Sequence, residues 1–310
     1  MSYEVENDSA RTPPSTPARA LADTLSRAPV AGPLDKLSGT SALDPLIGPL
    51  RSAVRGLPLG PARDVLHGGW LGHPLHPALV QFPMGAWMSA GVLDLLPGTH
   101  RSSRALVGAG LLAALPAALA GWTDWAEQRK PQMRTGLVHA ASNSLAVGLY
   151  TASLAARMRG RRCRGKLLGF AGLAAAGGGA LLGGHLAYRQ GSGVNKTESV
   201  SDIVEPGWHA LGRAEAYSLG RPSRTTLGEV PLLVVRESDG VRVLADRCSH
   251  EAGSLSGGEV ADGCVTCPRH GSVFRLSDGW NLAGPATAPQ PSFETRVRAD
   301  GVLEVRLPDA

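Results

Sequence analysis

Four long apolar stretches separated by short polar segments dominate the first two thirds of the chain. They cover residues of about 76–96, 104–123, 136–156 and 167–188. A bilayer core needs about 20 consecutive apolar residues per helix, and the buried helices of a soluble protein rarely give four such stretches in succession. The fourth stretch is rich in Gly and Ala, which allows close helix packing in lipid. The pattern predicts a four-helix transmembrane domain over residues 66–189.

The distribution of polar and apolar positions changes after the fourth stretch. Residues 190–204 are rich in Gly, Ser and charged side chains and predict a flexible linker. From residue 205 onward, short β-type runs such as "VPLLVVRE" and "GVLEVRL" alternate with turns, among them four Asp-Gly steps. The fold class that we expect is therefore multi-domain. An α-helical four-span transmembrane bundle is followed by a small all-β domain over residues 205–310.

The N-terminal segment differs from both domains. Residues 1–65 carry many Pro, Ser and Gly and only short apolar clusters, and they lack the basic-then-apolar order of a signal peptide. We expect a mostly disordered tail with a candidate interfacial helix near residues 42–55.

Composition narrows the classes of function. The net charge of +5 on 310 residues is modest, and no interleaving of aromatic and basic residues occurs, so nucleic acid is not an expected partner. Three of the four cysteines lie within residues 248–267. This clustering favours metal binding over a disulfide scaffold.

Two mixed Cys-His pairs are the clearest chemical signal of the sequence. They have the form Cys248-x-His250 and Cys267-x-x-His270. Zinc fingers instead use one pair of cysteines and one pair of histidines. The motifs "CSH" and "CPRHGS", followed by "GPATAP" at 284–289, resemble the Rieske [2Fe-2S] family over about residues 205–308. The resemblance implies two cysteines on one iron and two histidines on the other.

Departures from the subtypes of that family are informative. Quinol-oxidising Rieske proteins carry a disulfide between the two ligand loops, and this chain has Gly253 and Arg269 at those positions. The chain therefore resembles the ferredoxin or oxygenase branch, with Cys264 as an inert strand residue. Ser272 and Pro285 are expected beside the cluster, whereas Phe274 replaces a tyrosine donor, which favours a low to intermediate potential.

A terminal oxygenase is excluded for this chain alone. Such an enzyme needs a mononuclear iron site of two histidines and a carboxylate after the cluster. Only 40 residues follow His270, and none of them is His.

Polar side chains are predicted to gather on the membrane side that carries the Rieske domain. With four spans, both ends of the bundle face that side, and each span contributes polar groups there. These groups are His73, His76, Trp122, Asp124, Trp125, His139, Asn143, His185 and Tyr188.

Several interpretations of this set remain open. His76, His139 and His185 are candidate axial ligands of a b-type haem. A direct metal site would use His73, His76, Asp124, His139 and His185. A quinone pocket is a third interpretation, and simple contact with headgroups and water is the alternative without a site. The stretch from "HGGWLGHPLHPALV" to "GGHLAY" also resembles an uncharacterised bacterial four-helix membrane family over about residues 66–190, which implies architecture but no activity.

Charge gives opposing indications of sidedness. The loop "RMRGRRCRGK" holds six basic residues, a density typical of the cytoplasmic side, and it lies opposite the Rieske domain. The absence of the disulfide pair suits a reducing compartment for that domain. We expect a multi-pass protein of the bacterial cytoplasmic membrane with the Rieske domain on the cytoplasmic side.

Together these features predict a membrane-anchored Rieske-type iron–sulfur electron-transfer protein. It would act as a one-electron carrier between an unidentified donor and acceptor, with membrane lipid as its other partner. It would be a component of an oxidoreductase system rather than a complete enzyme. The alternative is an iron–sulfur redox sensor or interaction module on a membrane anchor.

Overall fold

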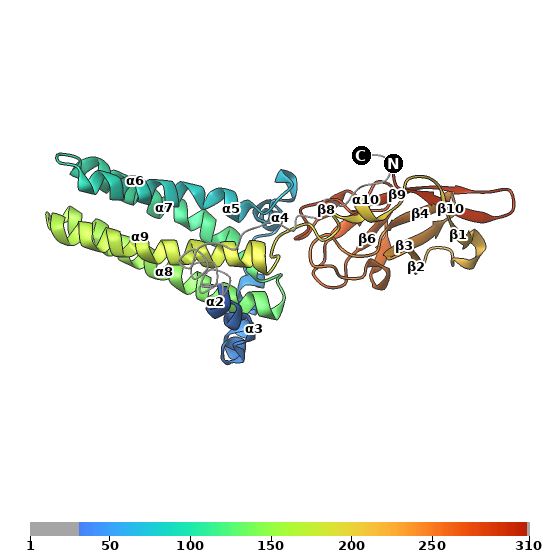
Figure 1. Cartoon of the computed structure of the whole chain (residues 1–310), viewed down its shortest axis with the longest axis horizontal. Coiled ribbons are helices and arrows are strands. Elements are labelled where there is room, and N and C mark those ends of the chain that lie inside the picture. Colours follow the sequence, from blue (N-terminus) through green and yellow to red (C-terminus); the bar gives the residue numbers. More distant parts are fainter. Residues whose placement is uncertain (1–30, 309–310) are drawn as a thin grey trace, which may run out of the picture.

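The computed structural model describes residues 31–308. The part of the expected disordered tail before residue 31 lies outside this range. The chain forms an elongated molecule with a helical region at one end and a β-rich region at the other (Figure 1). The helices are α2 (Ala31–Gly39), α3 (Asp44–Arg55), α4 (Ala62–His67), α5 (Leu75–Leu79), α6 (Gln81–Leu95), α7 (His100–Trp125), α8 (Lys130–Met158), α9 (Arg162–Gly184) and α10 (Val200–Ile203).

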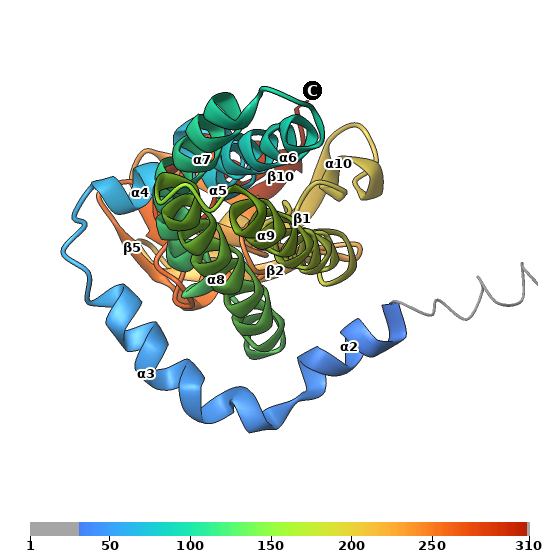
Figure 2. The same cartoon turned by 90° about the vertical axis from the view of Figure 1, so that its left-hand side faces the viewer.

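The helical region consists of two antiparallel hairpins, one made by α5, α6 and α7 and the other by α8 and α9 (Figures 1 and 2). Trp87 of α6 and Tyr150 of α8 stack at its centre with ring centroids 4.2 Å apart. Glycine permits this packing, because a Cβ on Gly110 would overlap the Trp87 ring and one on Gly172 would lie 2.9 Å from the Tyr150 ring.

Within residues 31–308, two helices are by themselves long and apolar enough to cross a membrane. They are α7 and the continuous helix formed by α9 and the π-helical turn η3 (His185–Arg189), together Arg162–Arg189. The first expected span is broken into α5 and α6, and the third, α8, is interrupted by polar residues. The sequence prediction of four spans is thus supported in part, by two long apolar helices.

The segment from residue 31 to 65 is largely helical, although the sequence predicted mostly irregular structure with one candidate helix near residues 42–55, where α3 lies. Helices α2 and α3 form an arc beside the bundle (Figure 2). Arg134 of α8 binds both carboxylate oxygens of Asp44 at 2.7 and 2.8 Å, and Arg189 pairs with Asp35 at 2.9 Å. These contacts supply the tertiary stabilisation that a short isolated helix lacks, and composition alone did not reveal them.

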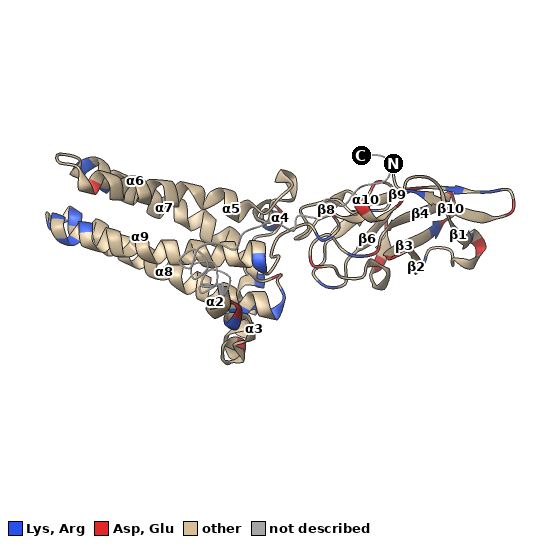
Figure 3. Ribbon diagram, viewed as in Figure 1, with Lys and Arg blue, Asp and Glu red and all other residues tan. Residues whose placement is uncertain are grey.

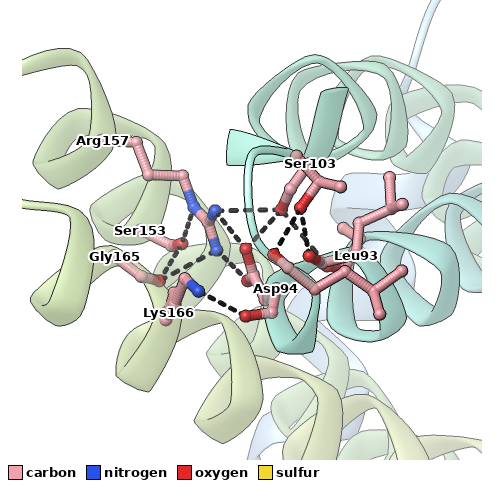
Figure 4. A network of polar contacts seen from close by, with 10 residues as sticks. Leu93, Asp94, Ser103, Ser153, Arg157, Gly165 and Lys166 are labelled. Atoms are coloured by element: carbon pink, nitrogen blue, oxygen red, sulfur yellow. Dashed lines mark hydrogen bonds and ion pairs between the residues drawn. The ribbon is translucent and has the colours of Figure 1, made fainter. Parts of the chain in front are cut away.

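A buried polar network joins the helices at the end of the bundle away from the β-rich region (Figure 4). Arg157 of α8 donates to Asp94 of α6, with 2.8 Å between Nη1 and Oδ1. Ser103 of α7 donates to the same carboxylate at 2.7 Å. The nearby Arg101 and Arg104 of α7 take no part in this network. Ser103 occupies the inward face of α7, so both arginines point outward and are exposed.

The β-rich region contains two antiparallel sheets. The larger has the strand order β1-β10-β9-β4-β3-β2, and the smaller has the order β5-β6-β7-β8. The strands are β1 (His209–Arg213), β2 (Pro222–Leu227), β3 (Val230–Glu237), β4 (Gly240–Ala245), β5 (Glu259–Ala261), β6 (Cys264–Thr266), β7 (Val273–Arg275), β8 (Asn281–Ala283), β9 (Ser292–Val297) and β10 (Val302–Arg306).

Strand β3 has apolar side chains on both faces because it separates two cores. Leu232 and Val234 face the core of the larger sheet, and Leu233 and Val235 face the core around the smaller sheet. The second core also contains Phe274, which is fully buried. The Cys-His loops extend from this second core.

The segment at 190–204 is more ordered than the expected flexible linker. The backbone of Lys196 donates to Ser249 at 2.9 Å, and Val200 and Val204 are buried in the core of the larger sheet. Two apolar side chains within a polar stretch thus attach α10 to the β-rich region. The part of this segment that does not pack on the β-rich region is therefore limited to the residues between the end of the helical bundle and Lys196.

Candidate metal centre

Two loops on the smaller sheet side carry the Cys-His pairs. One follows β4 and contains Cys248 and His250, and the other joins β6 to β7 and contains Cys267 and His270. Each loop closes on itself through a backbone hydrogen bond. The Cys248 amide donates to the Gly253 carbonyl at 2.7 Å, and the Cys267 amide donates to the Ser272 carbonyl at 2.8 Å. Each loop therefore presents one thiol and one imidazole at its tip.

The four side chains are arranged as a buried pair and an outer pair. Cys248 and Cys267 are 1% and 3% exposed. Outside them, the Nδ1 atoms of His250 and His270 lie 3.3 Å apart, with the ring planes at 78°. Two nitrogens bound to one tetrahedral metal at about 2.1 Å would lie about 3.4 Å apart. The outer pair thus fits one metal atom, and the buried thiols suit a second.

A mononuclear site does not fit as well. Within residues 31–308, no three His, Cys, Asp or Glu side chains converge closely enough to hold one metal ion. Separation of a thiol pair from an imidazole pair is the arrangement that a two-iron cluster needs, because each iron takes only two protein ligands. The donor set therefore fits a [2Fe-2S] cluster of mixed ligation.

The electrostatics of the loops favour the metal-binding form of both imidazoles and of one of the two thiols. Burial, with a smaller contribution from His270, lowers the pKa of His250 to about 3. Burial also lowers the pKa of His270. The hydrogen bond between the thiols raises the pKa of Cys248 and lowers that of Cys267 to about 6. Both imidazoles are consequently neutral near pH 7, the state in which a ring nitrogen binds metal.

The loop after β8 covers the centre and fixes Ser272. Ser272 is fully buried, and its Oγ accepts a hydrogen bond from the Ala286 amide at 3.1 Å. Because Oγ acts as an acceptor there, its own hydrogen is free to point to a bound sulfide. Pro285, which precedes Ala286 in this loop, is buried. Gly284 has φ +84°, and a Cβ there would lie 2.7 Å from Ser272 Cα, so this position requires glycine.

Gln290 is a supporting residue that the sequence did not single out. Its Oε1 accepts from the Ser249 amide at 3.0 Å, and its Nε2 donates to the carbonyls of Ala245 and Arg247 at 2.6 and 2.5 Å. It is 1% exposed. The side chain therefore ties the first ligand loop to the strand that precedes it. No local motif marks such a residue, since its partners lie more than 40 positions away.

The ligand loops face the helical region rather than open solvent (Figure 1). Gly284 donates its amide hydrogen to Asp64 of α4 at 2.9 Å. Arg129, just before α8, forms an ion pair with the buried carboxylate of Glu251, with 2.8 Å between Nε and Oε2. Together these two contacts link the ligand loops and the loop that covers them to the end of the bundle.

The structure gathers some of the polar residues predicted for the bundle and separates others. His76 and His139 lie together, with ring centroids 6.1 Å apart. His73 is exposed and contacts only the Pro74 carbonyl among the described residues. His185 lies 3.5 Å from Asp35 on another side of the bundle. The five residues expected to bind one metal ion therefore do not form a single cluster.

Asp124 has a partner that the sequence did not indicate. The Nδ1 atom of His67, at the end of α4, donates to Asp124 Oδ1 at 2.9 Å, and His67 is 2% exposed. The pair thus joins α4, which also contacts Gly284 through Asp64, to the end of α7. The left-handed Gly68 that ends α4, with φ +81°, was the available local signal of a helix end there.

Comparisons with known proteins give two family matches. Residues 72–196 match a family described as a predicted membrane protein, DUF2231. Residues 207–294 match the Rieske [2Fe-2S] domain.

Similar individual proteins align with the β-rich region. The ferredoxin subunit of anthranilate 1,2-dioxygenase from Burkholderia cepacia is 34% identical over 100 residues, which are 32% of this chain and 92% of that protein. Ferredoxin CarAc from Metapseudomonas resinovorans is 35% identical over 72 residues, 23% of this chain and 67% of that protein. A solved complex of reduced oxygenase and oxidized ferredoxin in carbazole 1,9a-dioxygenase gives 30% identity and a TM-score of 0.31 over 33% of this chain and 95% of the matched chain.

Proposed function

Because the chain belongs to the Rieske [2Fe-2S] family through residues 207–294 and to the DUF2231 family of predicted membrane proteins through residues 72–196, we propose that it is a membrane-anchored one-electron carrier. Its C-terminal part is a Rieske ferredoxin-like electron-transfer domain. The observation that carries the proposal is the pair of facing imidazoles outside two buried thiols, Nδ1 to Nδ1 3.3 Å.

In this proposal Cys248, Cys267, His250 and His270 hold the cluster, which supplies reversible one-electron oxidation and reduction. The protein contributes burial on the thiol side and the loop of Gly284 and Pro285 as a cover. Ser272 would donate a hydrogen bond to a cluster sulfide. Such a bond stabilises the reduced, more negative cluster and raises its potential.

Purified full-length protein tests the cofactor. We expect a Rieske-type electron paramagnetic resonance signal after reduction in the wild type and in Cys264→Ser, whose thiol lies in β6 outside the ligand loops. Cys248→Ser should lose the signal and the bound iron. A signal that survives in Cys248→Ser would contradict the ligand assignment.

The membrane topology forms a second part of the proposal. Four spans would be built from α5 with α6, α7, α8, and α9 with η3, and α8 alone, at 29 residues, is about 43 Å long. Both α7 and Arg162–Arg189 are apolar enough to span. An even number of spans places the Rieske domain and the start of the bundle on one side, which we propose is the cytoplasmic side.

Native Cys163 can report the sidedness. It is exposed among the arginines at the end of the bundle opposite the Rieske domain (Figure 3). With the Rieske domain in the cytoplasm, a membrane-impermeant maleimide should label Cys163 in intact cells, and Cys163→Ser should abolish the label. Labelling that appears only after the membrane is opened would reverse the orientation, as the arginine density at that end would favour.

The redox partners are proposed by class. The relative from Burkholderia is the ferredoxin subunit of a dioxygenase, and a ferredoxin receives and passes on single electrons. We therefore propose a reductase as the electron donor and an oxygenase or a membrane redox protein as the acceptor. Stopped-flow mixing of reduced protein with a ferredoxin-dependent oxygenase tests this. Rapid cluster oxidation supports a carrier, whereas redox-dependent binding without turnover would indicate a sensor.

A further inference from the structure

The helical region contains an internal duplication. His139, Tyr150 and Arg157 of α8 follow His76, Trp87 and Asp94 by the same interval of 63 residues (139 − 76, 150 − 87 and 157 − 94). The same order therefore recurs along both helices: an imidazole, an aromatic ring 11 positions later and a charge 18 positions later.

The second helix of each hairpin repeats as well. Gly172, Gly179 and Gly183 of α9 follow residues 110, 117 and 121 of α7 by 62 positions. Both Gly110 and Gly172 pack under the aromatic ring of their own hairpin. The hairpin of α5, α6 and α7 and the hairpin of α8 and α9 are consequently two copies of one unit.

Equivalent residues of the two units meet one another. The imidazoles of His76 and His139 lie 6.1 Å apart between ring centroids, Trp87 stacks on Tyr150, and Asp94 pairs with Arg157. Contact between equivalent positions is the mark of a two-fold relation. The three pairs therefore line a pseudo-two-fold axis that runs along the bundle from the Rieske end to the arginine end.

The imidazole pair on this axis is held in one tautomer from both sides. His76 Nδ1 donates to the Ala117 carbonyl at 2.8 Å, and His139 Nδ1 donates to the Gly179 carbonyl at 2.8 Å. Four residues after each acceptor is a glycine, Gly121 or Gly183, whose Cβ would come within 2.8 or 3.2 Å of the ring. Both units therefore contain the same two features: a backbone carbonyl that accepts from the imidazole and a glycine that leaves space for the ring.

This geometry leaves both Nε2 atoms as lone-pair donors to a metal. A histidine that ligates through one ring nitrogen usually donates its other N–H to a carbonyl or carboxylate. We propose that His76 Nε2 and His139 Nε2 bind a transition-metal centre on the pseudo-two-fold axis, either haem iron or a free metal ion. Two imidazoles on opposite sides of one metal at about 2.1 Å would have centroids about 6.5 Å apart, which is close to the observed 6.1 Å.

The surroundings define which side chains take part. The Asn143 amide lies 3.2 Å from His139 Nε2 and 3.5 Å from its Nδ1, and it donates to the His139 carbonyl at 3.0 Å. A metal at Nε2 would displace only the first of these contacts. His185 is excluded, because its equivalent position in the first unit is Thr123 and it pairs with Asp35 away from the axis. Two protein ligands alone bind a free ion weakly, so a porphyrin or solvent would have to supply the remaining ligands.

The location suggests a role for this centre in electron transfer, and that role rests on the function proposed above. A metal here would be the intramolecular redox partner of the cluster. His76 lies at the Rieske end of the axis. His67 of α4 pairs with Asp124 at the same end of the bundle, and α4 contacts the loop that covers the cluster through Asp64 and Gly284.

Metal and porphyrin content of the purified full-length protein tests the site. The variants are His76→Gln and His139→Gln, with exposed His73→Gln as the matched control. We expect metal in excess of the cluster iron in the wild type and in His73→Gln, and at least a tenfold loss in the other two variants. A pyridine haemochrome assay separates the sources, since porphyrin indicates haem and its absence with retained metal indicates a free ion.

Further measurements keep the outcome decisive. An unchanged cluster signal and unfolding temperature in His76→Gln and His139→Gln would show that both variants fold. Cys248→Ser, which removes the cluster, should retain the second centre, so failure of one site is distinguishable from failure of the other. The site is refuted if wild-type protein contains no metal beyond the cluster and takes up neither added hemin nor Zn²⁺ or Cu⁺. Equal loss in His73→Gln would refute it as well.

Discussion

Replacing Asp94 by Asn tests whether the ion pair at the arginine end holds the two hairpins together. The guanidinium of Arg157 has two carboxylate contacts there, one of them at 2.8 Å, and the two side chains are 3% and 5% exposed. The substitution preserves volume but leaves the guanidinium charge buried without its counter-ion. Its remaining partners are neutral oxygens of Ser103, Ser153 and Gly165.

The expected effect is large. Removing one partner of a buried ion pair typically costs about 3–5 kcal/mol of unfolding free energy, because the other charge remains uncompensated. For a domain of this size, that corresponds to a fall in Tm on the order of 10 °C. Arg101→Gln is the matched control, since Arg101 is exposed at the same end of the molecule and should have little effect.

The pseudo-two-fold relation makes the test sharper. Asp94 and Arg157 occupy equivalent positions, so the double variant Asp94→Arg with Arg157→Asp places the same two charges in exchanged sites. We expect it to recover more than half of the stability lost in Asp94→Asn, as measured by circular dichroism during heating in detergent. A Tm within about 2 °C of the wild type in Asp94→Asn, or a double variant weaker than the single one, would refute the reasoning.

Three further predictions concern the Rieske domain. Ser272→Ala should lower the midpoint potential by on the order of 40 mV, because one hydrogen bond of about 1 kcal/mol to the reduced cluster is lost; spectroelectrochemical titration checks this, and an unchanged potential would remove Ser272 from the cluster environment. Gly284→Ala should accelerate cluster loss at least tenfold during incubation with a chelator, because the φ of +84° and the contact with Ser272 exclude a side chain. Arg129→Glu should make the residues before Lys196 accessible to limited proteolysis, because the 2.8 Å ion pair with Glu251 holds the Rieske domain against the bundle. Adding Glu251→Arg should restore protection, and equal cleavage of all three proteins would argue against this contact.

The Rieske part was the more predictable half of the chain. Each ligand loop encodes its own structure locally, because a cysteine and a histidine two or three positions apart sit on one tight turn. The Asp-Gly steps likewise mark hairpins by backbone preference alone. Gln290 was not predictable, since its role depends on backbone carbonyls of a strand that is distant in the sequence.

In the helical region, apolar length predicted the helices but not their partners. The pairing of Asp94 with Arg157 crosses 63 positions, and His67 lies just after a segment that composition marked as irregular. The duplication did leave a signal in the sequence. The stretch "AGLLAALPAALAG" at 109–121 returns as "AGLAAAGGGALLG" at 171–183. This repeat marks α7 and α9 as equivalent helices, and the two facing histidines stand at nearly the same interval, 63 positions, in the segments that precede them.

The ion pair between Asp94 and Arg157 on the pseudo-two-fold axis limits how such a bundle could be assembled from separate hairpins. A single hairpin that paired with an identical hairpin would bring two aspartates, or two arginines, into one buried site, since a two-fold axis makes each residue meet its own equivalent. Like charges in that position would oppose association. Joining the two units in one chain allows one to carry Asp94 and the other Arg157. The covalent link thus turns a symmetric dimer into an ordered pair, in which each hairpin can recognise its counterpart but not itself.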